Sequence, residues 1–201
     1  DKIKQLIGVQ LQAAGYYPNI NLIEQLQLFS GLYNKQADPM KMLEAVGLTE
    51  KAKSKYKELS GGQKQRFSVC TTLINNPRVI FLDEPTTGLH FDDIAKLMRA
   101  MRRLLEEGHS LIVIEHNLDV IRASDWLIDL GPEGGDEGGY VVAEGAPEDV
   151  RQHPTSHTAK ALRDYAEAMD TRYEVAKSAG LLAAEAPMHA ADAVVRDDGA
   201  I

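Results

Sequence analysis

The stretch "RVIFLDEPTTGLHF", Arg78 to Phe91, joins an apolar run to two adjacent carboxylates. Val79 to Leu82 predict a buried strand, because short apolar runs without alternation are typical of parallel strands covered on both faces. Asp83 then falls at the carboxyl end of that strand, where ligands of open α/β sheets bind. The stretch therefore predicts an α/β fold with a Mg²⁺ ligand at Asp83.

The second acid, Glu84, has a different orientation from Asp83 because it follows directly in the chain. A carboxylate in this place is suited to orient or deprotonate a water that attacks a phosphoryl group. An ordinary surface turn is the simpler alternative, and the two acids alone leave it open.

A second candidate motif is "LSGGQKQR", Leu59 to Arg66. A helix that opens with Ser60, Gly61 and Gly62 presents free N–H groups at the positive end of its dipole, and glycines let an anion approach closely. An ordinary capped helix is the alternative. Gly61 and Asp83 are 22 positions apart, which leaves room for one helix and a turn and favours a shared site.

Two further polar residues follow predicted strands. His116 comes just after the apolar run in "LIVIEHNLDVI", where a neutral imidazole suits contact with a γ-phosphate or with the attacking water. Gln12 follows Ile7, Val9 and Leu11, whose alternation predicts the first strand. A structural histidine and a solvated glutamine remain the alternatives.

The remaining pattern alternates helices and strands, which indicates a mostly parallel sheet flanked by helices. We expect one α/β domain over residues 1–169, a small helical subdomain over about 19–76, and an alanine-rich tail over 170–201 that is partly helical or disordered. The predicted helices are 21–33, 38–46, one capped by Ser60, 92–107, 118–123 and 155–169, and the predicted strands are 79–82, 111–114, 126–130 and 140–145, with a loop at 131–139.

The amino-acid composition limits the classes of protein to which this chain can belong. The single cysteine, Cys70, excludes an intramolecular disulfide and a multi-cysteine zinc site, so we expect no zinc and a reducing, cytoplasmic setting. No apolar run reaches the roughly 20 residues that span a bilayer, and no segment resembles a signal peptide. The net charge of -8 argues against a nucleic-acid surface over the whole chain, although a local basic patch stays open.

Taken together, these motifs resemble those of the ATP-binding-cassette (ABC) ATPases. Residues 59–63 match the signature motif, 79–84 the Walker B strand with its catalytic glutamate, and 87–90 the D-loop, while His116 matches the switch histidine and Gln12 the Q-loop glutamine. The resemblance implies a P-loop NTPase fold that uses ATP and Mg²⁺ and pairs head-to-tail with a second ABC ATPase domain.

The resemblance also implies a role for each matched residue. Ser60, Gly61, Gly62 and Gln63 would contact ATP held by the partner domain. Asp83 and Gln12 would bind Mg²⁺, and Glu84, His116 and Gln12 would act in hydrolysis.

One part of the pattern is missing. A phosphate-binding loop needs glycine-rich backbone and a Lys-Ser or Lys-Thr pair, and no Gly-Lys pair occurs in this sequence. The acidic "GPEGGDEGG" at 131–139 has no lysine and cannot replace it. Because the family places this loop upstream of the Q-loop, we expect a truncated loop rather than a mutated one, and an isolated chain that is inactive.

The two halves resemble different branches of the family. Residues 3–89 resemble the ATPase subunit of a multidrug or antibiotic exporter, and residues 82–163 resemble the carboxyl-terminal part of UvrA, the damage-recognition ATPase of bacterial nucleotide excision repair. His90 stands where exporters usually carry Asp.

The zinc-bearing insertion that UvrA places before its signature is absent, so the sequence favours a transporter ATPase subunit. In that interpretation residues 21–46 meet a membrane permease subunit, and the chain is cytoplasmic or peripheral at the inner face of the membrane. The alternatives are a UvrA-like ATPase that acts with damaged DNA and repair proteins, and a non-catalytic fragment or chimera.

Overall fold

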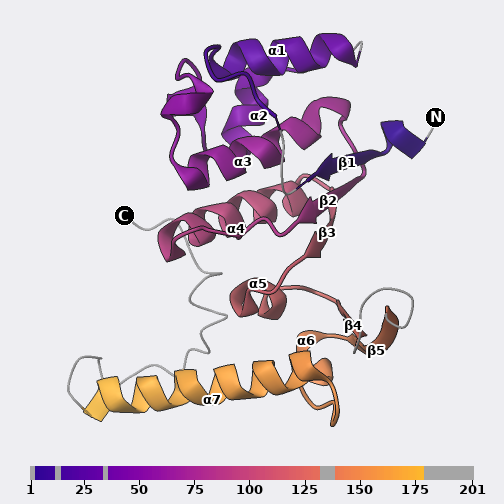
Figure 1. Cartoon of the computed structure of the whole chain (residues 1–201), viewed down its shortest axis with the longest axis vertical. Helices are drawn as coiled ribbons and strands as arrows, with labels where there is room; N and C mark the ends of the chain where they lie inside the picture. The colour runs from indigo at the N-terminus through magenta and orange to yellow at the C-terminus, as the bar shows by residue number, and fades with distance from the viewer. Residues whose placement is uncertain (1–2, 12–14, 34–35, 132–138, 179–201) are drawn as a thin grey trace. The chain divides into compact units, whose positions relative to one another are not determined.

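The computed structural model describes residues 3–11, 15–33, 36–131 and 139–178. They divide into two compact units, residues 1–115 and 116–201 (Figure 1). Among the described residues, no helix is long and apolar enough to cross a membrane. The predicted loop at 131–139 and the end of the predicted tail fall largely on residues that are not described.

The first unit contains a three-stranded parallel sheet in the order β1-β2-β3. Its strands are β1 (Ile7–Gln10), β2 (Val79–Asp83) and β3 (Ser110–Ile114). Its helices are α1 (Leu22–Leu32), α2 (Pro39–Ala45), α3 (Gly61–Thr71) and α4 (Phe91–Glu106), with short 3-10 turns η1 (Ile3–Gln5), η2 (Thr49–Lys51), η3 (Tyr56–Glu58) and η4 (Thr72–Asn75). These bounds lie within a residue or two of the predicted ones.

The register of the sheet brings three strand ends together. Val79 of β2 lies opposite Ile7 of β1 and Ser110 of β3, and Asp83 lies opposite Ile114. Parallel strands that start level also finish level, so their carboxyl ends form one edge. The predicted α/β fold is confirmed, with Asp83 at that edge.

The buried face of β1 is not the one that its alternating apolar residues suggest. The alternating apolar residues Val9 and Leu11 are half exposed, whereas Gly8 and Gln10 are buried. Gly8 is needed there because a Cβ would lie 2.6 Å from the backbone oxygen of Thr72 in η4. The close approach of η4 therefore decides which face of β1 is buried.

The opposite face of this sheet is apolar and open. Val9, Ile112 and Ile114 each expose about half of their surface (50%, 48% and 57%). Contiguous exposed apolar groups of this kind are uncommon on monomeric proteins and usually mark a contact with other polypeptide.

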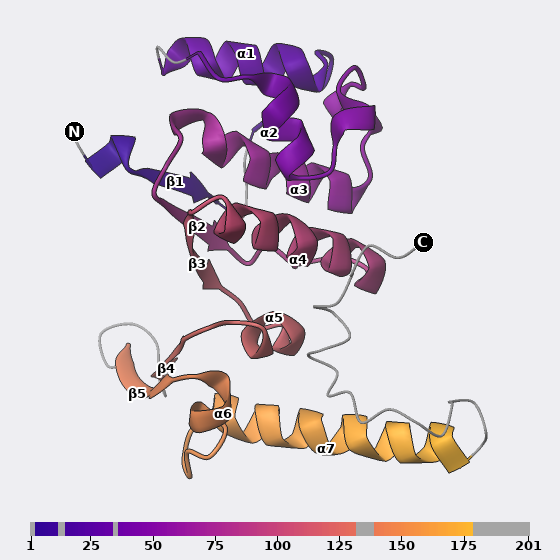
Figure 2. The same cartoon turned by 180° about the vertical axis from the view of Figure 1, so that it is seen from behind.

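The described part of the second unit contains three helices and two strands. They are α5 (Leu118–Arg122), β4 (Leu127–Gly131), β5 (Tyr140–Gly145), α6 (Pro147–Val150) and α7 (His157–Ser178), the long helix in Figure 2. The β4 strand pairs antiparallel with β5 and forms a separate two-stranded sheet. The expectation that residues 126–130 add to the parallel sheet is therefore wrong, because local pairing with β5 satisfies β4.

Two hydrogen-bonded contacts hold α7 within its unit. The Asp129 carboxylate on β4 accepts hydrogen bonds from Ser156 (2.6 Å) and Thr158 (2.7 Å) at the start of the helix. Farther along, the Tyr165 hydroxyl donates to Asp119 of α5 at 2.6 Å. The helix extends to Ser178, beyond the predicted end at residue 169.

An aromatic cluster packs against α3 in the first unit. The Tyr16 ring lies 4.6 Å from Tyr56 and 5.4 Å from Phe67, measured between ring centroids, and its hydroxyl lies 3.1 Å from the hydroxyls of Ser68 and Thr71. Burial, and secondarily Tyr16, raises the pKa of Tyr56 from its ordinary value of 10.0 to about 12.

This raised pKa predicts a pH-dependent loss of stability. A group whose folded pKa lies above its unfolded value stabilises the fold below the unfolded pKa, and that stability is lost as pH rises through the folded pKa. We expect the free energy of unfolding of the first unit to fall between pH 10 and pH 12, measured by urea denaturation across this window. Tyr56→Phe should remove part of the loss, and Tyr17→Phe, at an exposed ring, should not.

Candidate functional site

The acidic turn after β2 is held by backbone and side-chain hydrogen bonds. The Glu84 N–H donates to the Ile114 carbonyl at 2.9 Å, which continues the pairing of β2 with β3 by one residue. The Thr87 hydroxyl donates to Glu84 Oε2 at 3.0 Å, and the Thr86 N–H donates to Glu115 Oε1 at 2.7 Å. Asp83 and Glu84 are therefore fixed, partly accessible and adjacent.

The backbone of Glu84 is strained. Its φ is +44°, in the left-handed region that L-residues with bulky side chains avoid. Among the described non-glycine residues, only Asn76 shares a positive φ, and asparagine tolerates it. Strain of about 1–3 kcal/mol persists where the surroundings impose it, and such residues cluster at functional sites.

A buried glutamine lies beside the same turn and was missed from the sequence. Gln10 is 3% exposed, and its Nε2 donates to the carbonyls of Leu11 (2.8 Å) and Asp83 (3.5 Å). Its Oε1 has no partner among the described groups. The only sequence signal was a polar residue within an otherwise apolar strand. Gln12, the predicted Q-loop residue, lies outside the described residues.

The signature residues form the amino-terminal turn of α3. Ser60 is its N-cap: Ser60 Oγ accepts from the Gln63 N–H at 3.2 Å, and Gln63 Oε1 accepts from the Ser60 N–H at 3.0 Å. This capping box leaves the N–H groups of Gly61 and Gly62 without a hydrogen bond to any described residue. Two free amides at a helix N-terminus suit an anionic ligand.

Gly62 brings α3 against the first turn of α4. A Cβ at Gly62 would lie 2.2 to 2.5 Å from the side chain of Asp93, so the contact requires glycine. Nearby, the buried Arg66 donates from Nη1 to the carbonyls of Val46 (3.0 Å) and Gly47 (2.8 Å). Burial lowers the pKa of Arg66, and Asp93 opposes that effect.

The other predicted residues are placed as follows. His90 is the N-cap of α4, next to Phe91, which is 78% exposed. His116 is the first residue of the second unit and precedes Asn117, the N-cap of α5. The structure thus groups Asp83 and Glu84 with Gln10, and Ser60 to Gln63 with Asp93, while the roles of Gln12 and His116 remain predictions.

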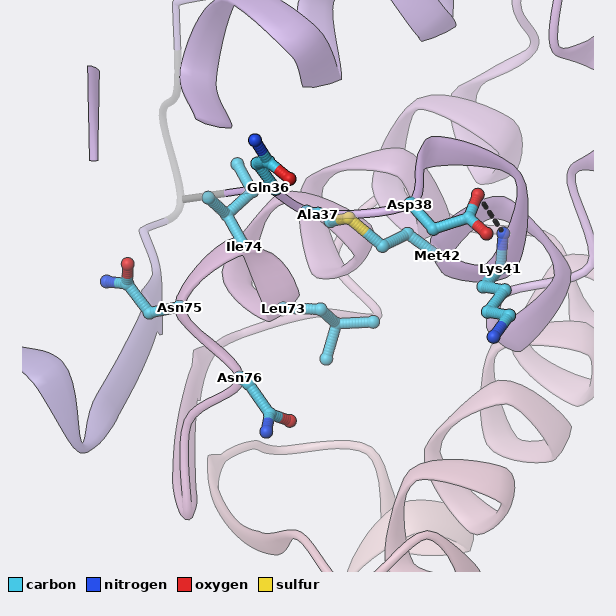
Figure 3. A pocket seen from close by; sticks show the side chains of 9 residues that line it. All are labelled: Gln36, Ala37, Asp38, Lys41, Met42, Leu73, Ile74, Asn75 and Asn76. Atoms are coloured by element: carbon cyan, nitrogen blue, oxygen red, sulfur yellow. Dashed lines mark hydrogen bonds between the residues drawn. The ribbon is translucent and has the colours of Figure 1, made fainter. Parts of the chain in front are cut away.

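A cavity of about 260 Å³ in the first unit shares no residue with these motifs. Its apolar side is formed by Met42, Leu73 and Ile74, and its polar side includes Asp38, which caps α2 through the Lys41 N–H (Figure 3). This cavity is therefore separate from Asp83 and Glu84 at the carboxyl edge of the sheet and from Ser60 to Gln63 at the start of α3.

Known proteins match this fold and these motifs. Residues 1–87 match the family described as "ABC transporter". The solved ATP-binding cassette MJ0796 in its ADP- and Pi-bound dimer is similar with a TM-score of 0.54 at 27% identity, over 62% of this chain and 58% of that one. The chain shares part of the fold of the ABC ATPase cassettes. UvrA2 from Deinococcus radiodurans gives a TM-score of 0.53 at 37% identity, over 73% of this chain and 18% of that one.

Several curated relatives share the name UvrABC system protein A. UvrABC system protein A of Deinococcus radiodurans is 57% identical over 108 residues, and that of Aquifex aeolicus is 54% identical over 110. These matches cover 52% and 53% of this chain, but only 11% and 12% of the relatives' length. The resemblance to both ABC cassettes and UvrA is confirmed, and these relatives favour the repair-type alternative over the transporter interpretation that the sequence favoured.

Gly62→Ala is predicted to destabilise the first unit by about 1–3 kcal/mol, because the new methyl group overlaps Asp93 and forces α3 away from α4. Gly61→Ala is the matched control: no atom lies within 4 Å of its Cβ position, so it should be neutral or slightly stabilising. Urea denaturation measures both. Equal stability of the two variants would contradict the close contact.

Replacing Glu84 tests the backbone strain. Glu84→Gly and Glu84→Ala both remove the carboxylate and its bond from Thr87, but only glycine adopts a φ of +44° without steric cost. We expect the glycine variant to be more stable than the alanine variant by about 1 kcal/mol, measured by urea denaturation. The reverse order, which is usual at ordinary positions, would show that the turn is unstrained.

Proposed function

We propose that this chain is the ATP-hydrolysing part of a UvrA-like ATPase. In such a protein, nucleotide-driven pairing of two ABC domains is coupled to the binding of damaged DNA. The observation that carries the proposal is the strained Glu84, held at the exit of β2 beside Asp83. The free amides of Gly61 and Gly62 and the similarity to UvrA proteins support it. The chain covers only a small share of the length of those relatives. The ATPase activity and the coupling to DNA are therefore both proposed for this chain.

Each residue has a distinct role in the proposal. The Asp83 carboxylate is the ligand offered to Mg²⁺, which would neutralise phosphate charge when bound. Glu84 orients and deprotonates water, and its bond from Thr87 holds its direction. Ser60, Gly61, Gly62 and Gln63 serve the nucleotide of a second ABC domain. His116 serves the γ-phosphate, and Gln12 serves Mg²⁺ and the attacking water.

These residues fit the metal and water part of an ATP site, but not its phosphate cradle. No Gly-Lys pair occurs in the sequence, and the cradle depends on such a pair. The open apolar face at Val9, Ile112 and Ile114 would suit packing by a segment that carries the cradle. We propose that this segment lies outside the 201 residues of this sequence.

Two observations favour the transporter interpretation: the family match over residues 1–87 and the absence of the zinc-bearing insertion before the signature. In that case α1 and α2 would contact a permease subunit at the inner face of the membrane. Damaged duplex and repair proteins are the partners in the UvrA-like proposal.

The 201-residue chain should bind ATP weakly and show no turnover, because the strongest phosphate contacts are missing. Fusing the phosphate-loop segment of the Deinococcus radiodurans UvrA ahead of residue 1 should restore hydrolysis. Glu84→Gln in the fusion should lower turnover by about 10² or more while ATP binding remains. Calorimetry and phosphate release measure the two quantities.

Two outcomes would contradict this scheme. Micromolar ATP affinity of the unfused chain would show that another group holds the phosphates, and an inactive fusion would favour the non-catalytic fragment. A second measurement distinguishes the UvrA-like proposal from the transporter interpretation. In the UvrA-like case, the active fusion should bind damaged duplex more tightly than intact duplex. Equal affinity for both, together with recovery of the fusion in the membrane fraction, would favour the transporter.

A further inference from the structure

A cluster of lysines precedes and enters the signature helix. We define the lysine cluster as Lys51, Lys53, Lys55, Lys57 and Lys64. Residues 50–66 hold six basic and two acidic side chains, a net charge of +4, so the rest of the chain carries -8 - 4 = -12. Such a charge asymmetry within an acidic chain points to a local surface for an anionic partner.

The lysine cluster is not neutralised within the structure. Among the described residues, none of its members forms a salt bridge, whereas Lys96 pairs with Asp92 and Lys160 pairs with Asp164. Lys51, Lys53, Lys55 and Lys57 are all exposed. Glu58, the nearest acid, accepts a hydrogen bond from the Lys55 backbone N–H instead. The positive charges therefore remain available to an outside partner.

The backbone beneath the lysine cluster is anchored. Ala52 and Leu59 are buried, and the carbonyls of Ser54 and Ala52 accept hydrogen bonds from the N–H groups of Leu22 (3.2 Å) and Ile23 (3.3 Å) at the start of α1. Lys57 donates to Asn19 at 3.2 Å. The lysine cluster is thus displayed on a fixed surface, which lowers the entropy lost when a partner binds.

The residues around the lysine cluster indicate which kind of anionic partner it would bind. The cavity beside α2 and η4 includes no member of the lysine cluster, and four of the five lysines are exposed, which favours an extended anion over a small enclosed phosphate ligand. No large apolar side chain between Met40 and Phe91 is exposed in the described structure, although membrane-binding segments pair their cations with apolar anchors. A polymer of phosphates fits these conditions best.

The aromatic side chains near the lysine cluster indicate whether the partner is double-stranded or single-stranded nucleic acid. Single-strand binding relies on aromatic rings that stack on bases. The aromatic ring within the cluster, Tyr56, already packs against Tyr16 at 4.6 Å and Phe67 at 5.9 Å, and Lys64 lies over it at 5.7 Å. Within residues 50–66 the surface therefore offers charge without a free ring, which suits the backbone of a duplex.

We infer that the lysine cluster binds the phosphate backbone of double-stranded nucleic acid without reading its sequence. This inference rests on the proposed function in one respect: it names the surface through which the same chain would contact nucleic acid. It requires no nucleotide, so its test is made without ATP and can fail while the proposed hydrolysis holds, or hold while hydrolysis fails.

The test uses the full chain and an undamaged duplex of about 30 base pairs, with affinity measured by fluorescence anisotropy between about 50 and 200 mM salt. Each phosphate contact contributes about -0.9 to the slope of log K against log salt concentration. The triple variant Lys51→Gln, Lys53→Gln, Lys55→Gln should therefore make the slope shallower by about 2.7. The corresponding triple arginine variant should keep the original slope, because it keeps the charge.

The matched control is Lys41→Gln, Lys96→Gln, Lys160→Gln, which changes the net charge of the chain equally at lysines outside the cluster. It should leave the slope nearly unchanged. Equal effects of the two glutamine variants would overturn the inference, since binding would then follow net charge alone. Absence of salt-dependent duplex binding, or tighter binding to vesicles of anionic phospholipid than to duplex, would overturn it as well.

Discussion

The first unit depends on β2 being hydrogen-bonded along both of its edges. Its pairing with β1 and β3 fixes the register, and the register places Asp83 level with Ile114 and beside Gln10. One further bond, from the Glu84 N–H to Ile114, turns the chain into a left-handed conformation directly after the strand. The two carboxylates thus differ in environment because the sheet ends between them.

The signature helix is positioned by polar and steric contacts more than by an apolar stripe. Gly62 allows contact with Asp93, Arg66 reaches the carbonyls at the end of α2, and Tyr16 lies against the hydroxyls of Ser68 and Thr71. These contacts join α3 to α2, α4 and the segment after the Q-loop position. These contacts fix the position of α3 and with it the free amides at its start.

Much of this arrangement was predictable, and the failures have physical causes. The Ser60 cap, the Asp38-Pro39 start of α2 and the buried run of β2 are local signals, and the structure confirms them. The side of β1 that is buried was not predictable, because it depends on Gly8 meeting Thr72, which is distant in sequence. The pairing of β4 with β5 and the role of Gln10 likewise depend on contacts between separate segments.

The sequence by itself determined the element types, the order of the motifs and the absence of a Gly-Lys pair, since these follow from residue identity and spacing along one chain. Only the tertiary structure decided that Glu84 is strained, that Gly62 is required against Asp93, and that the cluster lysines are unpaired while Lys96 and Lys160 are paired. Backbone strain, steric fit and charge neutralisation are properties of groups brought together from different segments, and no local pattern encodes them.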